Sequence, residues 1–90
     1  MNEIEEVVNQ AINYLTNLDF EYYEDHYGYS KWETIKKTIL EKRCVKNFDG
    51  SIATYSIFGL RVETKAQSKS INVNELKKIL ERKDEQLRLF

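Results

Sequence analysis

Hydrophobic residues near the N-terminus recur at the spacing of an α-helix. They are Ile4, Val7, Val8, Ala11, Ile12, Leu15 and Leu18. A period of three to four residues places them on one face. Asn2 can cap this helix, and the acidic side chains that follow complement the positive end of its dipole. The pattern therefore predicts a first amphipathic helix from about Ile4 to Leu18.

Two further stretches have helical patterns with N-terminal caps. Ser30 followed by Glu33 is a capping box, which predicts a second long helix that reaches about Arg43. Its apolar face consists of Trp32, Ile35, Ile39 and Leu40. A final helix is predicted from Asn72, with apolar Val73, Leu76, Ile79 and Leu80. Either Asn72 or Ser70 can cap it.

Between these helices the sequence changes to residues that favour β-structure. Asp49-Gly50 predicts a turn between strands Cys44–Phe48 and Ile52–Phe58, and so a β-hairpin. Gly59 is either a bulge or the turn into a third short strand, Leu60–Thr64. The polar segment Lys65–Ser70 is predicted to be a loop.

Together these elements predict one α+β domain over residues 1–85, followed by a short peptide over residues 86–90. The domain has two to three N-terminal helices, a hairpin or three short strands, and a C-terminal helix. This order resembles that of a winged helix-turn-helix domain, although many such domains have a strand after the first helix. The resemblance implies that the helix from Ser30 to Arg43 is the recognition helix and that the Asp49-Gly50 hairpin is the wing.

Composition limits the class of protein. Ninety residues with 41% hydrophobic content suit one small core, and for a core of this size we expect that a homodimer can form. There is no basic leader followed by an apolar run, and no apolar stretch of the length that a membrane span needs. Cys44 is the only cysteine, which excludes an intramolecular disulfide. We therefore expect a cytoplasmic protein without a membrane partner.

Charge is unevenly distributed along the chain. Residues 1–29 hold seven acidic groups and no Lys or Arg, whereas residues 30–90 hold 14 basic and 8 acidic groups. Such asymmetry can mark a nucleic-acid-binding face, or it can make the two halves attract each other in the folded state. The candidate phosphate contacts are Lys31, Lys36, Lys37, Lys42, Arg43, Lys46, Arg61, Lys65 and Lys69.

The segment Asp19–Tyr29 interleaves aromatic rings, one imidazole and carboxylates. Phe20, Tyr23 and Tyr27 can share one face of a short helix that Gly28 ends, completing a small core. The alternative is a partner surface, because Tyr is favoured at interfaces. His26 has no second imidazole or thiol beside it in the sequence, and a lone His binds a transition metal poorly, so we expect no metal site.

Catalysis finds little support in the sequence. There is no glycine-rich phosphate loop, no nucleophile elbow and no pair of histidines at ligand spacing. Cys44 and His26 lack a local signature of a thiol nucleophile. We expect a protein that is not an enzyme and has no cofactor.

The last five residues are Gln86-Leu87-Arg88-Leu89-Phe90. They resemble the short motif by which bacterial replication and repair proteins bind the sliding clamp of DNA polymerase. The resemblance implies that Gln86 enters a small polar pocket, that Leu87 lies along the rim, and that Leu89 and Phe90 fill an apolar cavity. The alternative is that this stretch merely ends the last helix, which would leave Leu89 pointing away from the face of Leu80.

Three hypotheses about function follow. The first is a non-enzymatic interaction protein that binds the bacterial sliding clamp through residues 86–90 and recruits to, or modulates, replication or repair. The second is a winged-helix DNA-binding regulator of phage or plasmid type. The third is a small phage inhibitor that binds a host protein through the acidic, Tyr-rich segment.

Overall fold

The computed structural model describes residues 3–18 and 28–88. Along the chain these form α1 (Glu3–Thr16), α3 (Lys31–Ile35), the π-helical turn η1 (Lys36–Leu40), β1 (Cys44–Phe48), β2 (Ser51–Ser56), β3 (Gly59–Glu63), β4 (Ser68–Asn72) and α4 (Val73–Arg88). The strands make one antiparallel sheet in the order β1-β2-β3-β4. The predicted α+β class is confirmed.

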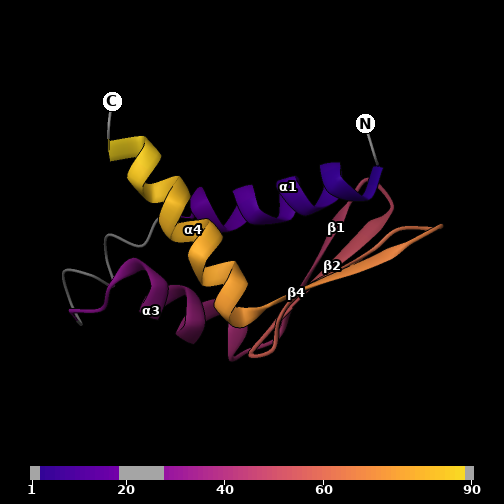
Figure 1. Cartoon of the computed structure of the whole chain (residues 1–90). Coiled ribbons are helices and arrows are strands. Elements are labelled where there is room, and N and C mark those ends of the chain that lie inside the picture. The colour runs from indigo at the N-terminus through magenta and orange to yellow at the C-terminus, as the bar shows by residue number, and fades with distance from the viewer. Residues whose placement is uncertain (1–2, 19–27, 89–90) are drawn as a thin grey trace.

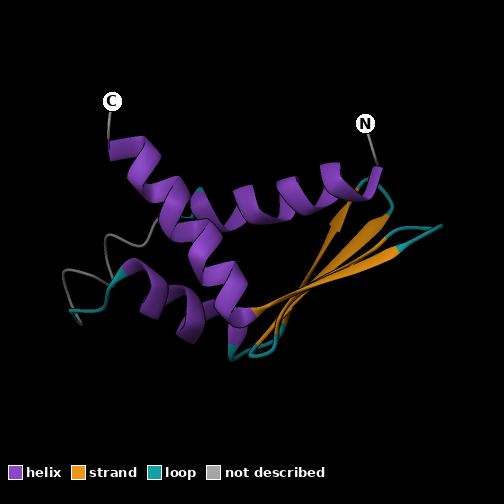
Figure 2. Ribbon diagram, in the orientation of Figure 1, coloured by secondary structure: helices purple, strands orange, loops and turns teal. Residues whose placement is uncertain are grey.

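Helices α1 and α4 lie on the same side of the twisted sheet and contact each other (Figure 1). Helix α1 packs across β1, β2 and β3, and α4 packs against β3 and β4. The buried side chains of α1 are those that its periodicity predicts, from Ile4 to Leu15. The fold therefore has two layers, with a single core between the helices and one face of the sheet (Figure 2).

The second predicted helix forms, but it is not uniform. The Ser30 hydroxyl accepts a hydrogen bond from the backbone N–H of Glu33 at 3.2 Å, as the capping box requires. After Ile35 the helix widens, and the N–H of Glu41 bonds to the carbonyl of Lys36 five residues earlier at 2.8 Å. The helical geometry ends at Leu40, before the expected Arg43.

The Asp49-Gly50 hairpin is confirmed. Both residues have positive φ, 51° and 87°, as the turn that best fits the twist of two strands requires. The side-chain oxygen of Asn47 accepts a hydrogen bond from the N–H of Gly50 at 3.0 Å. Strand β2 ends at Ser56, not at Phe58, and Gly59 begins a third strand.

The predicted loop Lys65–Ser70 is wrong, because a fourth strand begins at Ser68. Residues 64–67 form the turn, which the N–H of Thr64 closes by bonding to the carbonyl of Gln67 at 2.8 Å. Strand β4 lies at an edge of the sheet, and only Ile71 of its five residues is buried. Because the other four are polar, no alternation of apolar and polar residues marks this strand in the sequence. The sheet thus exceeds the hairpin or three strands expected, and the winged-helix resemblance stays a prediction.

Several predicted features fall on residues that the structure does not describe. These are the Asn2 cap and the short helix over residues 19–27. Gly28, the first residue after that segment, has a φ of 68°, in the left-handed region that favours glycine.

Asn72 caps α4, because its side-chain oxygen accepts a hydrogen bond from the N–H of Glu75 at 2.8 Å.

Tyr55 connects the two layers. Its side chain is fully buried, and its hydroxyl donates a hydrogen bond of 2.7 Å to the carbonyl of Ala11 in α1. The ring of Tyr14, also in α1, lies with its centroid 5.9 Å from that of Tyr55. One side chain of β2 is thus held by both packing and a buried hydrogen bond to the helix above it.

Gly59 is required where β3 begins beside β4. A Cβ atom added there would lie 2.1 Å from the carbonyl oxygen of Ile71, and φ is 126°. We expect Gly59→Ala to lower the free energy of unfolding by about 3 kcal/mol or more. Gly50→Ala is the matched control, because a Cβ there meets nothing within 4 Å, and only the cost of positive φ, about 1–2 kcal/mol, applies. Urea unfolding followed by circular dichroism measures both, and equal losses would contradict the close approach.

Tyr55→Phe removes the bond to Ala11 while keeping the ring. We expect a loss of about 1 kcal/mol near neutral pH. Burial away from water, and then the neighbouring Tyr14 and Cys44, raise the pKa of Tyr55. The unfolded chain therefore ionises this phenol first, from about pH 10, and ionisation there favours unfolding.

The stabilisation by the Tyr55 hydroxyl is thus fully present below about pH 10 and declines as the pH rises further. Unfolding measured at a series of pH values should show the advantage of the native chain over Tyr55→Phe shrinking above about pH 10. A difference that stays constant through this range would show that the hydroxyl is not buried as described.

Candidate functional site

The sheet face that α1 and α4 leave uncovered is mostly polar. Strand register identifies its side chains: Val45 lies opposite Thr54, Thr54 opposite Arg61, and Arg61 opposite Ser70. The inward partners of the same strands, such as Ala53 and Val62, are buried in the core. We call the outward side the open face, and define it by the residues Val45, Asn47, Ile52, Thr54, Ser56, Arg61, Glu63, Ser68 and Ser70.

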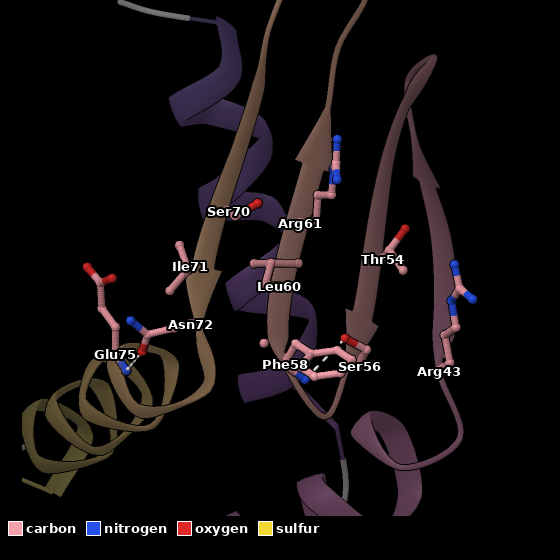
Figure 3. A pocket seen from close by; sticks show the side chains of 11 residues that line it. Arg43, Thr54, Ser56, Phe58, Leu60, Arg61, Ser70, Ile71, Asn72 and Glu75 are labelled. Atoms are coloured by element: carbon pink, nitrogen blue, oxygen red, sulfur yellow. Dashed lines mark hydrogen bonds between the residues drawn. The ribbon is translucent and has the colours of Figure 1, made fainter.

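A hollow of about 610 Å³ lies on the open face, at the end where β2 turns into β3. Strands β2, β3 and β4 and residues beside the strands supply its lining (Figure 3). Arg43 precedes β1, Phe58 lies in the β2–β3 turn, Arg61 projects from β3, and Glu75 lies in the first turn of α4. Phe58 is 80% exposed, an unusual position for a large apolar ring.

The charges at the hollow are arranged by sign. Arg61 is neutralised locally, because its Nε lies 2.8 Å from Oε1 of Glu63. Arg43 and Glu75, by contrast, form no ion pair with any other residue of the described segments. They lie on opposite sides of the hollow with Phe58 between them (Figure 3). The hollow therefore has a cationic side, an anionic side and an apolar centre.

The groups that line the hollow are suited to hydrogen bonds, ion pairs and contact with an aromatic ring. The lining supplies guanidinium, hydroxyl, amide and carboxylate groups around an aromatic ring, and no imidazole or thiol is among the lining residues. In residues 3–18 and 28–82, no three His, Cys, Asp or Glu side chains gather where they could hold a metal ion. No helix that the structure describes is both long and apolar enough to cross a membrane.

The basic residues proposed for nucleic-acid binding divide between the two sides of the sheet. Three of them have contacts within the chain: Lys31 Nζ donates to the carbonyl of Thr16 at 3.3 Å, Lys37 Nζ lies 5.3 Å from the Tyr29 ring centroid, and Lys46 Nζ lies 4.9 Å from that of Tyr14. Of the remainder, only Arg43 and Arg61 line the hollow. Lys36 is half-buried, and Lys42, Lys65 and Lys69 are exposed outside the hollow.

The clamp-like motif lies at the opposite end of α4 from the hollow. Gln86, Leu87 and Arg88 belong to the last turn of α4, and Leu89 and Phe90 lie outside the described residues. Helix α4 is anchored in the core by Leu76 and Leu80, after which Glu81 and Arg82 are exposed.

Of the residues that line the hollow, the sequence pointed to Arg43 and Arg61 but not to Phe58 or Glu75. The signal for Phe58 was present, because Ile57 and Phe58 are adjacent apolar residues directly before a glycine and so fall in a turn. Nothing in the sequence marked Glu75, because a glutamate in the first turn of a helix is an ordinary partner of the helix dipole. Comparison with protein-family models, with curated proteins and with solved structures finds no match for this chain.

Proposed function

We propose that this chain is a non-enzymatic interaction protein that binds the bacterial DNA polymerase sliding clamp through residues 86–90. The observation that carries the proposal is the order of residue types, Gln-Leu-Arg-Leu-Phe, in which a polar anchor precedes three apolar side chains. The pattern resembles the motif of clamp-binding proteins at four of its positions, and Arg88 occupies the variable one.

The position of the motif on α4 supports this assignment. Core anchoring of α4 by described side chains reaches Leu80, and Gln86 lies about 9 Å further along the axis at 1.5 Å per residue. Figure 1 shows α4 running away from the sheet towards its C-terminal end. A partner that captures this end therefore meets the motif before it meets the core or the hollow.

The binding that the resemblance implies would require the last turn of α4 to open, because a continued helix would point Leu89 away from the face that carries Leu87. Gln86, Leu87 and Arg88 are helical in this chain. The final carbonyls of a helix have no partners within it, and terminal turns open at low free-energy cost. The helical backbone is thus compatible with capture of the tail.

The expected strength follows from the anchors. Full burial of an apolar side chain such as Leu or Phe contributes about 1.5–3 kcal/mol. The ordering of the peptide and the loss of translational freedom offset much of the sum over Leu87, Leu89 and Phe90. We therefore expect a micromolar complex. Bound in this way, the domain would be recruited to the clamp, where it takes part in or modulates replication or repair.

Isothermal titration calorimetry with a purified bacterial sliding clamp tests the proposal. The native chain should bind with a micromolar dissociation constant, and a chain ending at Glu85 should not bind measurably. Leu89→Ala/Phe90→Ala should be as defective as the truncation, because it removes the two deepest anchors. Arg88→Ala is the matched control and should keep its affinity within about threefold, because the variable position contacts no pocket.

Circular dichroism of each variant establishes that the domain is folded. Binding that survives removal of residues 86–90 would place the contact elsewhere on the domain. The absence of binding by the native chain would refute the assignment to the sliding clamp altogether.

A further inference from the structure

We infer that the open face is an interface between two copies of this chain, related by a two-fold axis that passes through the hollow near Phe58. This inference rests on the described residues of the sheet and of the first turn of α4, and it is independent of clamp binding by residues 86–90. Its basis is the charge of the hollow: the cationic side in one copy can face the anionic side in a second copy.

The charges occupy opposite edges of the sheet. Arg43 adjoins the edge strand β1, and Glu75 follows the other edge strand, β4. Three strand spacings separate these edges, a distance of about 14 Å. A two-fold axis midway between them brings Arg43 of each copy towards Glu75 of the other, so that one surface forms two equivalent ion pairs.

Phe58 lies at the place that the axis requires. It belongs to the turn that joins the two central strands, β2 and β3, and so lies between the charged edges. Two-fold symmetry would then place the Phe58 ring of one copy beside the Phe58 ring of the other and remove both rings from water. A central aromatic residue surrounded by charged and polar groups is the usual anatomy of a protein interface.

The other residues of the hollow allow a second copy to approach the open face closely. Its floor carries small residues, Ser56, Gly59 and Ser70, which leave room for a partner. Arg61 and Glu63 are paired with each other at 2.8 Å, so covering them does not bury an unpaired charge. Val45 and Ile52, which are also exposed, lie on the same open face and extend its apolar area.

A second copy fits this surface better than an anionic partner does. Phosphate groups of a nucleic acid would be attracted by Arg43 but repelled by Glu75, which forms no ion pair among the described residues. An acidic peptide would meet the same repulsion. A second copy of the chain offers a carboxylate to Arg43 and a guanidinium to Glu75.

Analytical ultracentrifugation from micromolar to millimolar concentration tests the interface. The native chain should show a reversible monomer–dimer equilibrium. Arg43→Glu and Glu75→Arg should each raise the dissociation constant at least about tenfold, because each creates two like-charge contacts. Phe58→Ser should also weaken the dimer. Lys69→Glu is the matched control for Arg43→Glu, because Lys69 lies opposite the buried Val62 and so belongs to the other face.

Two combinations of the variants restore the ion pairs. They show whether a single variant loses the dimer through the lost ion pairs or through general unfolding. The double variant Arg43→Glu/Glu75→Arg should dimerise within about threefold of the native chain. An equimolar mixture of the two single variants should form a heterodimer that neither variant matches alone, because every contact between them joins opposite charges. Circular dichroism confirms that each variant is folded.

A native chain that stays monomeric at millimolar concentration would overturn the inference. A dimer that tolerates both single charge reversals would place the interface on another surface. Failure of both the double variant and the mixture to restore the dimer would refute the pairing of Arg43 with Glu75.

Discussion

The buried Tyr55 side chain, packed in the core and bonded through its hydroxyl to the Ala11 carbonyl, joins the helical layer to the centre of the sheet. The hydrogen bond joins residues 44 positions apart and fixes α1 over the centre of the sheet. A hydroxyl in this position costs stability unless it is bonded. The bond therefore favours one placement of α1 over the alternatives that hydrophobic packing alone would allow.

The same small core accounts for where the chain can interact. One layer of helices covers one face of a four-stranded sheet, and the described residues supply no second layer for the other. The open face is mostly polar for this reason, and its exposed Phe58 is conspicuous. The two proposed surfaces, the open face and residues 86–90, lie at different places on the molecule. If both form, a dimer would present two clamp motifs, and binding of one would raise the effective concentration of the other.

Much of the fold could be predicted from the sequence, because its strongest local signals agree with the tertiary structure. The apolar period of α1, the Ser30 cap and the paired Asp49-Gly50 each specify an element through interactions within a few residues. Strand β4 could not be predicted in this way, because it owes its structure to pairing with β3 and buries only Ile71. The hollow could not be predicted from the sequence either, because strand register brings together Arg43, Phe58 and Glu75 from separate segments. Only the clamp-like motif is visible as a continuous stretch.

We propose that residues 86–90, and not the open face, bind the sliding clamp. Nuclear magnetic resonance of the isotopically labelled chain, titrated with a sliding clamp, tests this most directly, because each backbone amide reports separately. We expect the amide signals of residues 86–90 to shift or broaden first, while those of the open face, such as Thr54, Arg61 and Ser70, keep their positions. Unchanged signals at residues 86–90, or perturbations centred on the sheet, would contradict the proposed clamp binding.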